Sequence, residues 1–595
     1  MGIRHLYTNL RPYARPATLE PDTKIFIDGP GLAHHVYDQC FCAAATPQSS
    51  DGDNPWDSVI PYAVLQDGVI KYLRMLEGCG IYFDGALPPS KRPTRISRLE
   101  ESLGKLRTFH ASYAHTLPQC ARGGGGGGGG VVEMFSEKAV YTPKSSPLSS
   151  PPFIVAATLA ALSRSEYAGR TSTVPGEAEG YAARDAIATG GVVLTSDSDL
   201  LLFRGDGGGA GVWGVVMFKD VEVNFSTGKI STVLFRPDDI AKGFDLELAF
   251  LGYLSHCDPR ASFSTIRERC ARIAERGKSG ASVEGEMGRK WREFAAGYAF
   301  PEGDGGRLVE PRIAEVLSLR GCVGRKKEMF LPMLWEDTSR ASAWDVGREV
   351  RAVAYSLLFP GEMSLEEISR RGHGISGTPV EILPAREVKR KLNDILSESR
   401  QGNWIARHVL RQIVGAFATR NQPPPNTSIL ESCASLLSGG NRPYITTTTK
   451  KQSASARWTW ERIQIFAMLQ AAWYSLLLLS EVLKETTDTK TRLEVLPIET
   501  LDSRRFTDAL PGVGDRGLVK EVLAGYFEEE VEEEVEGREA EAKAVEGAPE
   551  GEARDGVWKE VGGKARKKKR RGTMEEAEVE ATVIGGGNMF AALVG

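Results

Sequence analysis

Residues 192–203 read VVLTSDSDLLLF, a short apolar run that ends in two aspartates and continues into a second apolar run. Two earlier stretches share the form of an apolar run ending in Asp, KIFIDG at 24–29 and GIYFDG at 80–85. Sequences with helical spacing lie between them, at 57–77 and 177–189. Strands that alternate with helices predict a parallel sheet covered by helices, which is an α/β fold. In such sheets ligands bind at the carboxyl ends of the strands, where these aspartates fall.

Six acidic side chains follow or lie within these runs and the segment VPGEAEG at 174–180. They are Asp28, Asp84, Glu177, Glu179, Asp197 and Asp199. Any one of them read alone is a surface acid that caps a helix or turn, whereas the whole set favours a common pocket. Carboxylates in one pocket repel one another and raise each other's pKa unless cations lie between them. We expect two Mg²⁺ ions, with Mn²⁺ as the other candidate, because every ligand is oxygen. Two such cations suit phosphodiester hydrolysis.

Composition sets limits on the class of protein. A chain of 595 residues is long enough for about two to four domains. Hydrophobic residues make up 41% and charged residues 26%, as in soluble globular proteins. The net charge is −4, but the stretch from residue 528 onwards carries −7 and the remainder +3. A body so close to neutral excludes a basic surface over the whole protein and favours a local phosphate-binding patch.

Neither the cysteines nor the longest apolar stretch indicates a disulfide-rich, zinc-binding or membrane-spanning protein. The eight cysteines form no paired CxxC spacing, so we expect reduced thiols and no zinc site. The stretch from Ile463 to Lys484 is interrupted by Gln464 and Gln470 and is too short for an uninterrupted membrane span. We expect a buried helix there and no membrane partner.

The chain divides into three predicted regions. Residues 1–240 hold the α/β domain, with an insertion at about 111–150 whose octaglycine and Ser-Pro composition has too little apolar surface to become ordered. Residues 241–527 follow helical apolar spacing and predict a mainly helical region. Residues 528–595 are Glu-rich and then basic, which is typical of a disordered tail.

Several short motifs, taken in order, resemble one nuclease superfamily. MGIRHL, IDGPG, YFDG followed by Lys-Arg, VPGEAEGYAA and TSDSDLLLF resemble the FEN/XPG-type structure-specific nucleases. The later segment FLPMLWEDTSRASAWDVGREVRAVAYSLL resembles fungal asteroid-domain proteins of that superfamily. No single motif is specific, but their order and intervals make a strong signal. The resemblance implies a PIN-like, FEN-like domain with an XPG-I segment, metal binding by the six carboxylates, and a role in DNA repair.

The resemblance also implies phosphate-binding residues. The family places a Lys and an Arg seven and fourteen residues after the second strand's Asp, and here these are Lys91 and Arg98. Their spacing of seven is about two helical turns, so both would lie on one helix face and steady the scissile phosphate. Arg92 and Arg95 add positive charge for nucleic-acid binding, or form a solvated helix start. Gly2 would lie near the substrate.

One segment departs from the family pattern. The family's further metal ligand lies in an L-G-S-D-Y-like motif followed by a Gly-rich helix-turn-helix that grips duplex DNA. The candidate segment from Phe250 to Ile266 reads FLGYLSHCDPRASFSTI and has no Asp at the expected place. Asp258 would substitute after a local shift. The departure puts duplex binding and full activity in doubt.

The tail carries a basic run that predicts nuclear import, although a general polyanion-binding patch fits too. Its residues are Lys564, Arg566, Lys567, Lys568, Lys569, Arg570 and Arg571. We expect a nuclear protein, or otherwise a cytoplasmic one. The closing apolar NMFAALV is either a short motif for a protein partner or an apolar terminus.

Two functions from different classes follow. The leading one is a Mg²⁺-dependent structure-specific endo- or exonuclease on branched or single-stranded DNA. The alternative is a catalytically weak or inactive scaffold with the same fold that binds RNA, DNA or protein partners. Dependence of cleavage on metal and on Asp197 and Asp199 discriminates between them.

Overall fold

The computed structural model describes most of the chain. The described residues are 3, 5–44, 62–76, 80–114, 148–204, 213–224, 227, 229–275, 285–303, 305–322, 324–420, 422–438, 459–486, 492–501 and 515–524. Met1–Glu530 form one compact unit, and the second unit, Val531–Gly595, lies outside the described residues. Most of the predicted insertion at 111–150 and the whole predicted tail at 528–595 therefore lie outside them as well.

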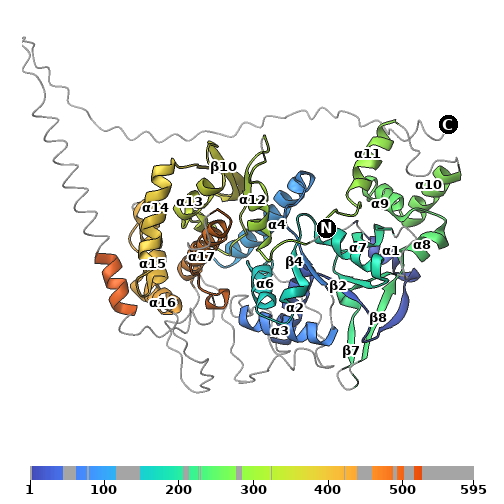
Figure 1. Cartoon of the computed structure of the whole chain (residues 1–595), viewed down its shortest axis with the longest axis horizontal. Helices are drawn as coiled ribbons and strands as arrows, with labels where there is room; N and C mark the ends of the chain where they lie inside the picture. The colour runs from blue at the N-terminus through green and yellow to red at the C-terminus, as the bar shows by residue number, and fades with distance from the viewer. Residues whose placement is uncertain are drawn as a thin grey trace, which may run out of the picture. The chain divides into compact units, whose positions relative to one another are not determined.

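A mainly parallel sheet of eight strands forms the first half of the chain, which confirms the predicted α/β fold class (Figure 1). Its order is β1-β8-β6-β5-β2-β3-β4, with β7 beside β8. The strands β2 to β6 pair in parallel, and β1, β7 and β8 are antiparallel additions at one edge. The strands are β1 (Arg15–Leu19), β2 (Ile25–Asp28), β3 (Gly80–Phe83), β4 (Thr171–Thr173), β5 (Val192–Thr195), β6 (Gly214–Met217), β7 (Glu222–Asn224) and β8 (Lys229–Phe235).

Two hydrophobic cores cover the two faces of this sheet. In β2, Ile25 and Ile27 belong to one core and Phe26 to the other, and Leu194 and Val193 of β5 divide in the same way. Side chains of a strand alternate between faces, and a parallel sheet is covered on both. The short apolar runs are therefore continuous because both of their faces are buried.

Helices pack on both faces (Figure 1). One core includes residues of α2 (Gly29–Ala44), α3 (Tyr62–Leu76), α4 (Arg92–Ser112) and α6 (Ile154–Ser163). The other includes residues of α1 (Leu6–Leu10), α7 (Ala178–Thr189), α8 (Pro237–Phe244), α9 (Leu248–Cys257), α10 (Phe263–Glu275) and α11 (Gly285–Ala296).

The region after α11 is mainly helical, as predicted, but it also contains a small sheet. Its helices are α12 (Pro311–Ser318), α13 (Arg348–Leu358), α14 (Ala385–Glu398), α15 (Trp404–Ala418), α16 (Thr427–Leu437) and α17 (Trp460–Thr486). The sheet has the order β11-β10-β9, with β9 (Glu328–Phe330), β10 (Ser364–Arg371) and β11 (Gly374–Glu381). Gly372, with φ 54°, starts the tight turn of the β10–β11 hairpin, and this backbone conformation suits glycine.

Helix α17 confirms the prediction of a buried helix from Ile463 to Lys484. It is long and apolar enough to cross a membrane, but 94% of its most apolar window is buried inside the protein. Gln464 interrupts the apolar run, and its side chain accepts a hydrogen bond from the Asp337 N–H and donates one to the Ala341 carbonyl. Helix α17 is therefore a core helix, and Gln464 is tolerated inside it because its side-chain amide is hydrogen-bonded.

Helix α4 joins the two halves of this unit. Leu106 and Phe109 belong to the core that also contains α12, α13 and α17. His110 lies 2.9 Å from Asp337, and the indole N–H of Trp460 at the start of α17 donates to the Tyr113 carbonyl. The helix that follows the second strand's Asp is therefore packed against the later, mainly helical region.

Candidate functional site

The sheet topology brings three of the predicted carboxylates together at the carboxyl ends of adjacent strands. Asp28 ends β2, and the neighbouring strands β3 and β5 run parallel to β2 on either side. Asp28 lies opposite Tyr82 in β3, so Asp84 follows just beyond that level, and Ile27 lies opposite Leu194, three residues before Asp197. The carboxyl ends of adjacent parallel strands thus present Asp28, Asp84 and Asp197 together.

The glycine after each strand's Asp allows neighbouring segments to approach. A Cβ atom on Gly29 would lie 2.6 Å from the Phe83 ring, and one on Gly85 would collide with the Val174 carbonyl oxygen. The Gly85 N–H donates to the Gly176 carbonyl at 2.9 Å. The close approach at Gly85 therefore holds Asp84 next to the segment that carries Glu177.

Asp28 is the most enclosed of the six carboxylates, with 7% of its surface exposed. It accepts hydrogen bonds from the Gly31 N–H at 3.1 Å and from the Thr195 hydroxyl at 2.9 Å. Burial raises the pKa of Asp28 and the charge of Asp197 raises it further, although the hydrogen bonds lower it. Asp28 and Asp197 therefore repel each other across the strand ends.

Asp84 caps helix α7. Its Oδ1 accepts a hydrogen bond at 2.8 Å from the N–H of Ala178, the first residue of that helix. Burial raises the pKa of Asp84 to about 7, and the charges of Asp28 and Glu177 contribute. The same carboxylate that stabilises the helix start thus faces two others.

Glu179 lies in the first turn of α7, shortly after Pro175 and Gly176. Burial raises its pKa well above the ordinary value, and the next largest contributions are the charges of Asp84, Asp28, Asp197 and Glu177. Four other acidic groups therefore act on this carboxylate at once.

Asp197 and Asp199 lie in the turn after β5. Asp197 accepts a hydrogen bond from the Asp199 N–H at 2.9 Å, and Asp199 accepts one from the Ile3 N–H at 2.7 Å. Burial and the charge of Asp197 raise the pKa of Asp199 to about 6. The start of the chain is thereby attached to the site, although Gly2 itself lies outside the described residues.

Tyr298 is a site residue that the sequence did not reveal. It follows α11, packs edge-on against Phe203 and lies close enough to Asp199 for the carboxylate charge to act on its hydroxyl. Burial raises its pKa, and the charges of Asp199, Asp197 and Glu177 raise it further. The Tyr298 hydroxyl therefore stays protonated beside these carboxylates. No local motif marks this tyrosine, which lies about 100 residues after Asp199 in the sequence.

Lys91 contacts the cluster directly. It caps α4, and its Nζ atom lies 2.9 Å from Oε1 of Glu177. Burial lowers the pKa of Lys91, but the hydrogen bond and charge of Glu177, with smaller contributions from Glu179 and Asp199, leave it raised. The ammonium group therefore stays charged beside the carboxylates while about half of the side chain is exposed (48%).

The three arginines predicted beside Lys91 differ in their surroundings. Arg98 is exposed on α4, two turns after Lys91. Arg92 pairs with Glu328, and Arg95 pairs with Glu315 through two hydrogen bonds of 2.6 and 2.8 Å. Arg92 and Arg95 thus hold α4 against the later region, and their predicted contact with nucleic acid stays a prediction.

The segment from Phe250 to Ile266 folds as two helices joined by a turn, although it lacks the glycines expected there. Asp258 ends α9 and lies 2.8 Å from Arg269 of α10. This ion pair connects the two helices across the turn. It occupies the carboxylate of Asp258, which is the predicted substitute for the missing metal ligand. The substitution stays a prediction.

The donor set fits a divalent cation. In the described part of the chain, no three or more His, Cys, Asp or Glu side chains lie in an arrangement that could hold a metal ion as they stand. Burial is the largest cause of the raised pKa values of Asp28, Asp84, Glu179 and Asp199, and the charges of the neighbouring carboxylates raise them further. Hard cations bind oxygen ligands of this kind and would remove the repulsion. The residues therefore suit Mg²⁺ or Mn²⁺.

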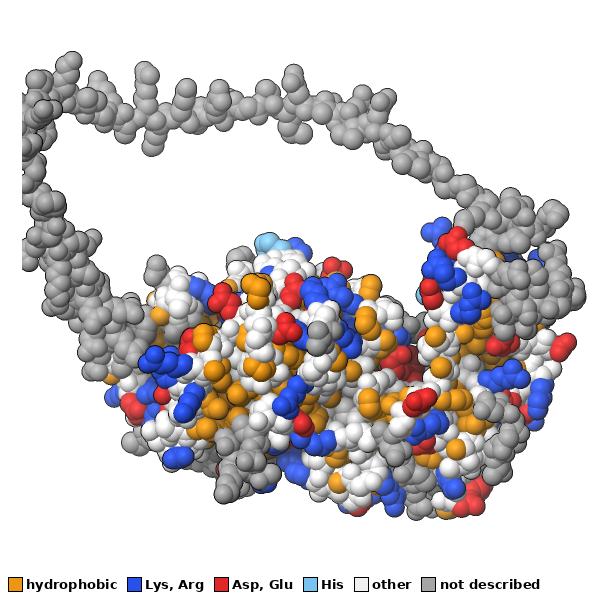
Figure 2. Space-filling view, turned by 45° about the horizontal axis from the view of Figure 1, so that its top comes forward, with side chains coloured by type: hydrophobic (Ala, Val, Ile, Leu, Met, Phe, Trp, Pro, Cys, Tyr) orange, Lys and Arg blue, Asp and Glu red, His pale blue; other side chains and the backbone are white. Residues whose placement is uncertain are grey.

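Figure 2 shows acidic side chains at the bottom of a recess in the molecular surface, with Lys and Arg side chains on the surface on both sides. Such a distribution is favourable for a polyanion, because basic side chains attract it and the recess can hold cations. The basic run from Lys564 to Arg571 lies outside the described residues, and nuclear import stays a prediction.

Residues 150–382 match the family model described as XPG domain containing. The match includes Glu177, Glu179, Asp197 and Asp199, whereas Asp28 and Asp84 precede it. An XPG domain suggests nucleic-acid binding and phosphodiester hydrolysis of the FEN/XPG type. The assignment to the asteroid branch stays a prediction. No curated protein matches the chain.

Proposed function

We propose, from the premise that residues 150–382 belong to the XPG domain-containing family, that this protein is a metal-dependent, structure-specific DNA nuclease. Its substrate is branched or single-stranded DNA, and its reaction is hydrolysis of a phosphodiester bond. The observation that carries the proposal is the convergence of carboxylates from three adjacent parallel strand ends on the start of α7, where Asp84 accepts a hydrogen bond from the Ala178 N–H.

Asp28, Asp84, Glu177, Glu179, Asp197 and Asp199 would hold the metal. When bound, two Mg²⁺ or Mn²⁺ ions would supply a water nucleophile and neutralise charge on the phosphate. The protein has already fixed several of these oxygens: Thr195 orients Asp28, the Ala178 N–H orients Asp84, and the Ile3 N–H donates to Asp199. Such preorganisation lowers the cost of assembling the site.

Lys91 is the residue that grips the scissile phosphate. In the free protein its ammonium group pairs with Glu177 at 2.9 Å, which offsets part of the carboxylate repulsion. Bound cations would supply that neutralisation instead, and Lys91 would then be available to bind a phosphate oxygen and to stabilise the charge that develops there. Arg98, exposed on the same helix two turns later, contacts a phosphate further along the strand.

The experiment that tests the proposal measures cleavage of labelled flap, splayed-arm and single-stranded DNA, and of RNA, with Mg²⁺ or Mn²⁺. The Asp197→Asn/Asp199→Asn variant is assayed beside the wild type. The proposal predicts metal-dependent cutting in the wild type and none in the variant, and the variant should unfold at no lower a midpoint than the wild type in the metal-free state, because two repelling charges are removed.

A second candidate is favoured by the Asp258–Arg269 ion pair, which employs the carboxylate near the position of the missing family ligand. With that ligand absent, the fold would serve as a scaffold that binds nucleic acid without cutting it. Equal background cleavage in wild type and variant, with metal-independent nucleic-acid binding in both, would identify this function.

A further inference from the structure

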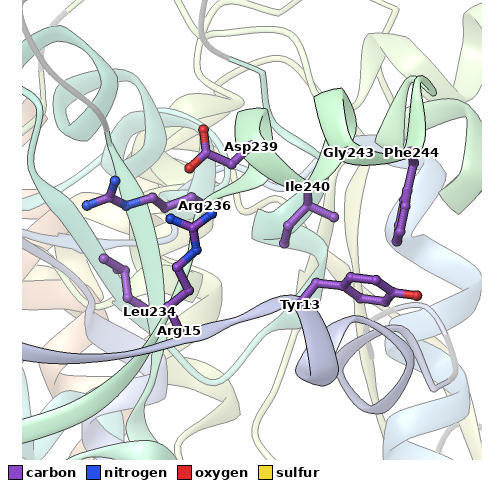
Figure 3. A pocket seen from close by; sticks show the side chains of 8 residues that line it. All are labelled: Tyr13, Arg15, Leu234, Arg236, Asp239, Ile240, Gly243 and Phe244. Carbon is purple, nitrogen blue, oxygen red and sulfur yellow. The ribbon is translucent and has the colours of Figure 1, made fainter.

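A second pocket lies away from the carboxylates (Figure 3). It has a volume of about 220 Å³ and lies between the start of β1, the end of β8 and helix α8. Strand β8 runs antiparallel to β6, with Phe235 opposite Val215. The end of β8 therefore lies at the amino-terminal end of the parallel strands, whereas Asp28 and Asp197 lie at their carboxyl ends. We call this cavity the arginine pocket, after Arg15 and Arg236 in its wall.

The charge of the arginine pocket favours an anion. Within the described part of the chain, Arg15 and Arg236 make no ion pair or side-chain hydrogen bond. Asp239 lines the same pocket, so its lining carries two positive charges against one negative charge. Outside the lining, Nη1 of Arg267 donates to the Tyr13 hydroxyl at 3.4 Å. Arginines without a carboxylate partner that line one cavity match the oxygens of a phosphate.

The opposite wall is aromatic and apolar. Figure 3 shows the guanidinium groups of Arg15 and Arg236 on one side of the pocket and the rings of Tyr13 and Phe244 on the other. The two ring centroids are 4.6 Å apart at 85°, and 41% of Tyr13 is exposed. Ile240 lies between the two sides. An exposed aromatic ring near arginines gives a base a surface to stack on while its phosphate is held.

We propose that the arginine pocket binds one nucleotide, with the phosphate on Arg15 and Arg236 and the base against Tyr13 and Phe244. The volume is smaller than the roughly 300–1,000 Å³ of pockets for drug-sized ligands, so it takes one nucleotide and no larger cofactor. The nucleotide is either free or part of a nucleic-acid strand, because both present the same phosphate and base. This inference does not depend on nuclease activity.

The experiment titrates the full-length protein with inorganic phosphate and with deoxyadenosine monophosphate at low ionic strength, by calorimetry. The Arg15→Gln/Arg236→Gln variant should bind the nucleotide at least about tenfold more weakly, because both charge-assisted contacts are lost. The Asp239→Asn variant should bind it several-fold more tightly, because a repulsive charge is removed. Lys242→Gln, an exposed change on the same helix outside the pocket, should have no effect.

Two further arms separate this site from the carboxylate site and identify the source of the phosphate. The Lys91→Met variant should retain nucleotide binding, and binding that depends on Lys91 but not on Arg15 and Arg236 would overturn the proposal. A short single-stranded DNA oligonucleotide that competes with the mononucleotide would show that the pocket takes nucleic acid. Mononucleotide binding without competition would show a site for the free nucleotide. Unchanged affinity in both the Arg15→Gln/Arg236→Gln and the Asp239→Asn variants would also contradict the proposal.

Discussion

The Nζ atom of Lys91 lies 2.9 Å from Oε1 of Glu177, so the first residue proposed to grip phosphate is paired with a residue proposed to bind metal. This ion pair links helix α4 to the start of helix α7. While this ion pair is intact, Lys91 is not available to bind phosphate and Glu177 is not available to bind metal. Metal binding and phosphate binding by this site are therefore expected to favour each other.

Replacing Lys91 by Met should reduce the rate of cleavage, because a positive charge at the scissile phosphate is lost. The expected loss in kcat is about 10²–10³-fold, the range found when one transition-state donor is removed. Lys105 is the matched control, because it lies on the same helix and pairs only with the exposed Glu101 at 3.0 Å. Single-turnover cleavage measures both variants. Equal rates for Lys91→Met and Lys105→Met would exclude the proposed role.

Adding Mg²⁺ at neutral pH should raise the unfolding midpoint, because the cation binds the folded carboxylates and not the unfolded chain. At a concentration 100 times the dissociation constant the gain is about 2.7 kcal/mol. The gain should shrink below about pH 6, because protons compete for Asp84 and Asp199, whose pKa values are raised to about 7 and about 6. Thermal melts with Mg²⁺ and with chelator check this. A full gain in the Asp197→Asn/Asp199→Asn variant would place the cation elsewhere.

The contact between α4 and α12 should contribute to stability through Arg95. Its guanidinium pairs with Glu315 through two hydrogen bonds and lies 3.7 Å from the centroid of the Phe330 ring. Arg95→Ala leaves a carboxylate that is only 13% exposed without a partner, and should lower the free energy of unfolding by about 2 kcal/mol. Arg107→Ala, on the exposed side of the same helix, should change it by less than about 0.5 kcal/mol. Urea unfolding compares the two, and equal effects would contradict this account of α4.

The protein should lose stability in acid partly because of His35. Its ring stacks on Phe218 at 5.0 Å, and burial lowers its pKa from 6.5 to about 4. Between these pH values the unfolded chain binds the proton and the folded protein does not. The free energy of unfolding therefore falls as pH falls through this window, by about 3 kcal/mol in full and about 2 kcal/mol by pH 5.

His35→Phe keeps an aromatic ring against Phe218 and removes the titration. Its free energy of unfolding should therefore fall less than that of the wild type between pH 7 and pH 5. Other titrating groups are common to both proteins and cancel in the difference. Parallel pH dependences in urea unfolding would show that His35 is not the cause.

The sequence predicted the part of the site that local patterns encode. The apolar runs before Asp28, Asp84 and Asp197 place these residues at strand ends, and a parallel sheet brings such ends together. Tyr298 could not be predicted, because nothing near it in the sequence indicates that its hydroxyl lies within the influence of the Asp199 charge. Tertiary contacts between distant segments determine that position.

In the region after α11, tertiary contacts again determine a structure that the local sequence pattern does not indicate. Strand β10 was missed because its buried residues include Glu367 and Arg370, which break the apolar alternation by which strands are recognised. Each has a buried partner from another element: Arg351 lies 2.5 Å from Glu367, and Glu336 lies 2.6 Å from Arg370. Pairing makes burial of these charges tolerable, and only the folded structure reveals the partners.

Cleavage by the Asp197→Asn/Asp199→Asn variant tests the central claim most directly. The purified full-length protein and the variant are compared on labelled flap, splayed-arm and single-stranded DNA, with Mg²⁺, with Mn²⁺ and with chelator. We expect metal-dependent cutting by the wild type that is absent in the variant, while both proteins bind the substrate. Undiminished cutting by the variant would contradict the proposed site, and no cutting by either protein would contradict the proposed nuclease.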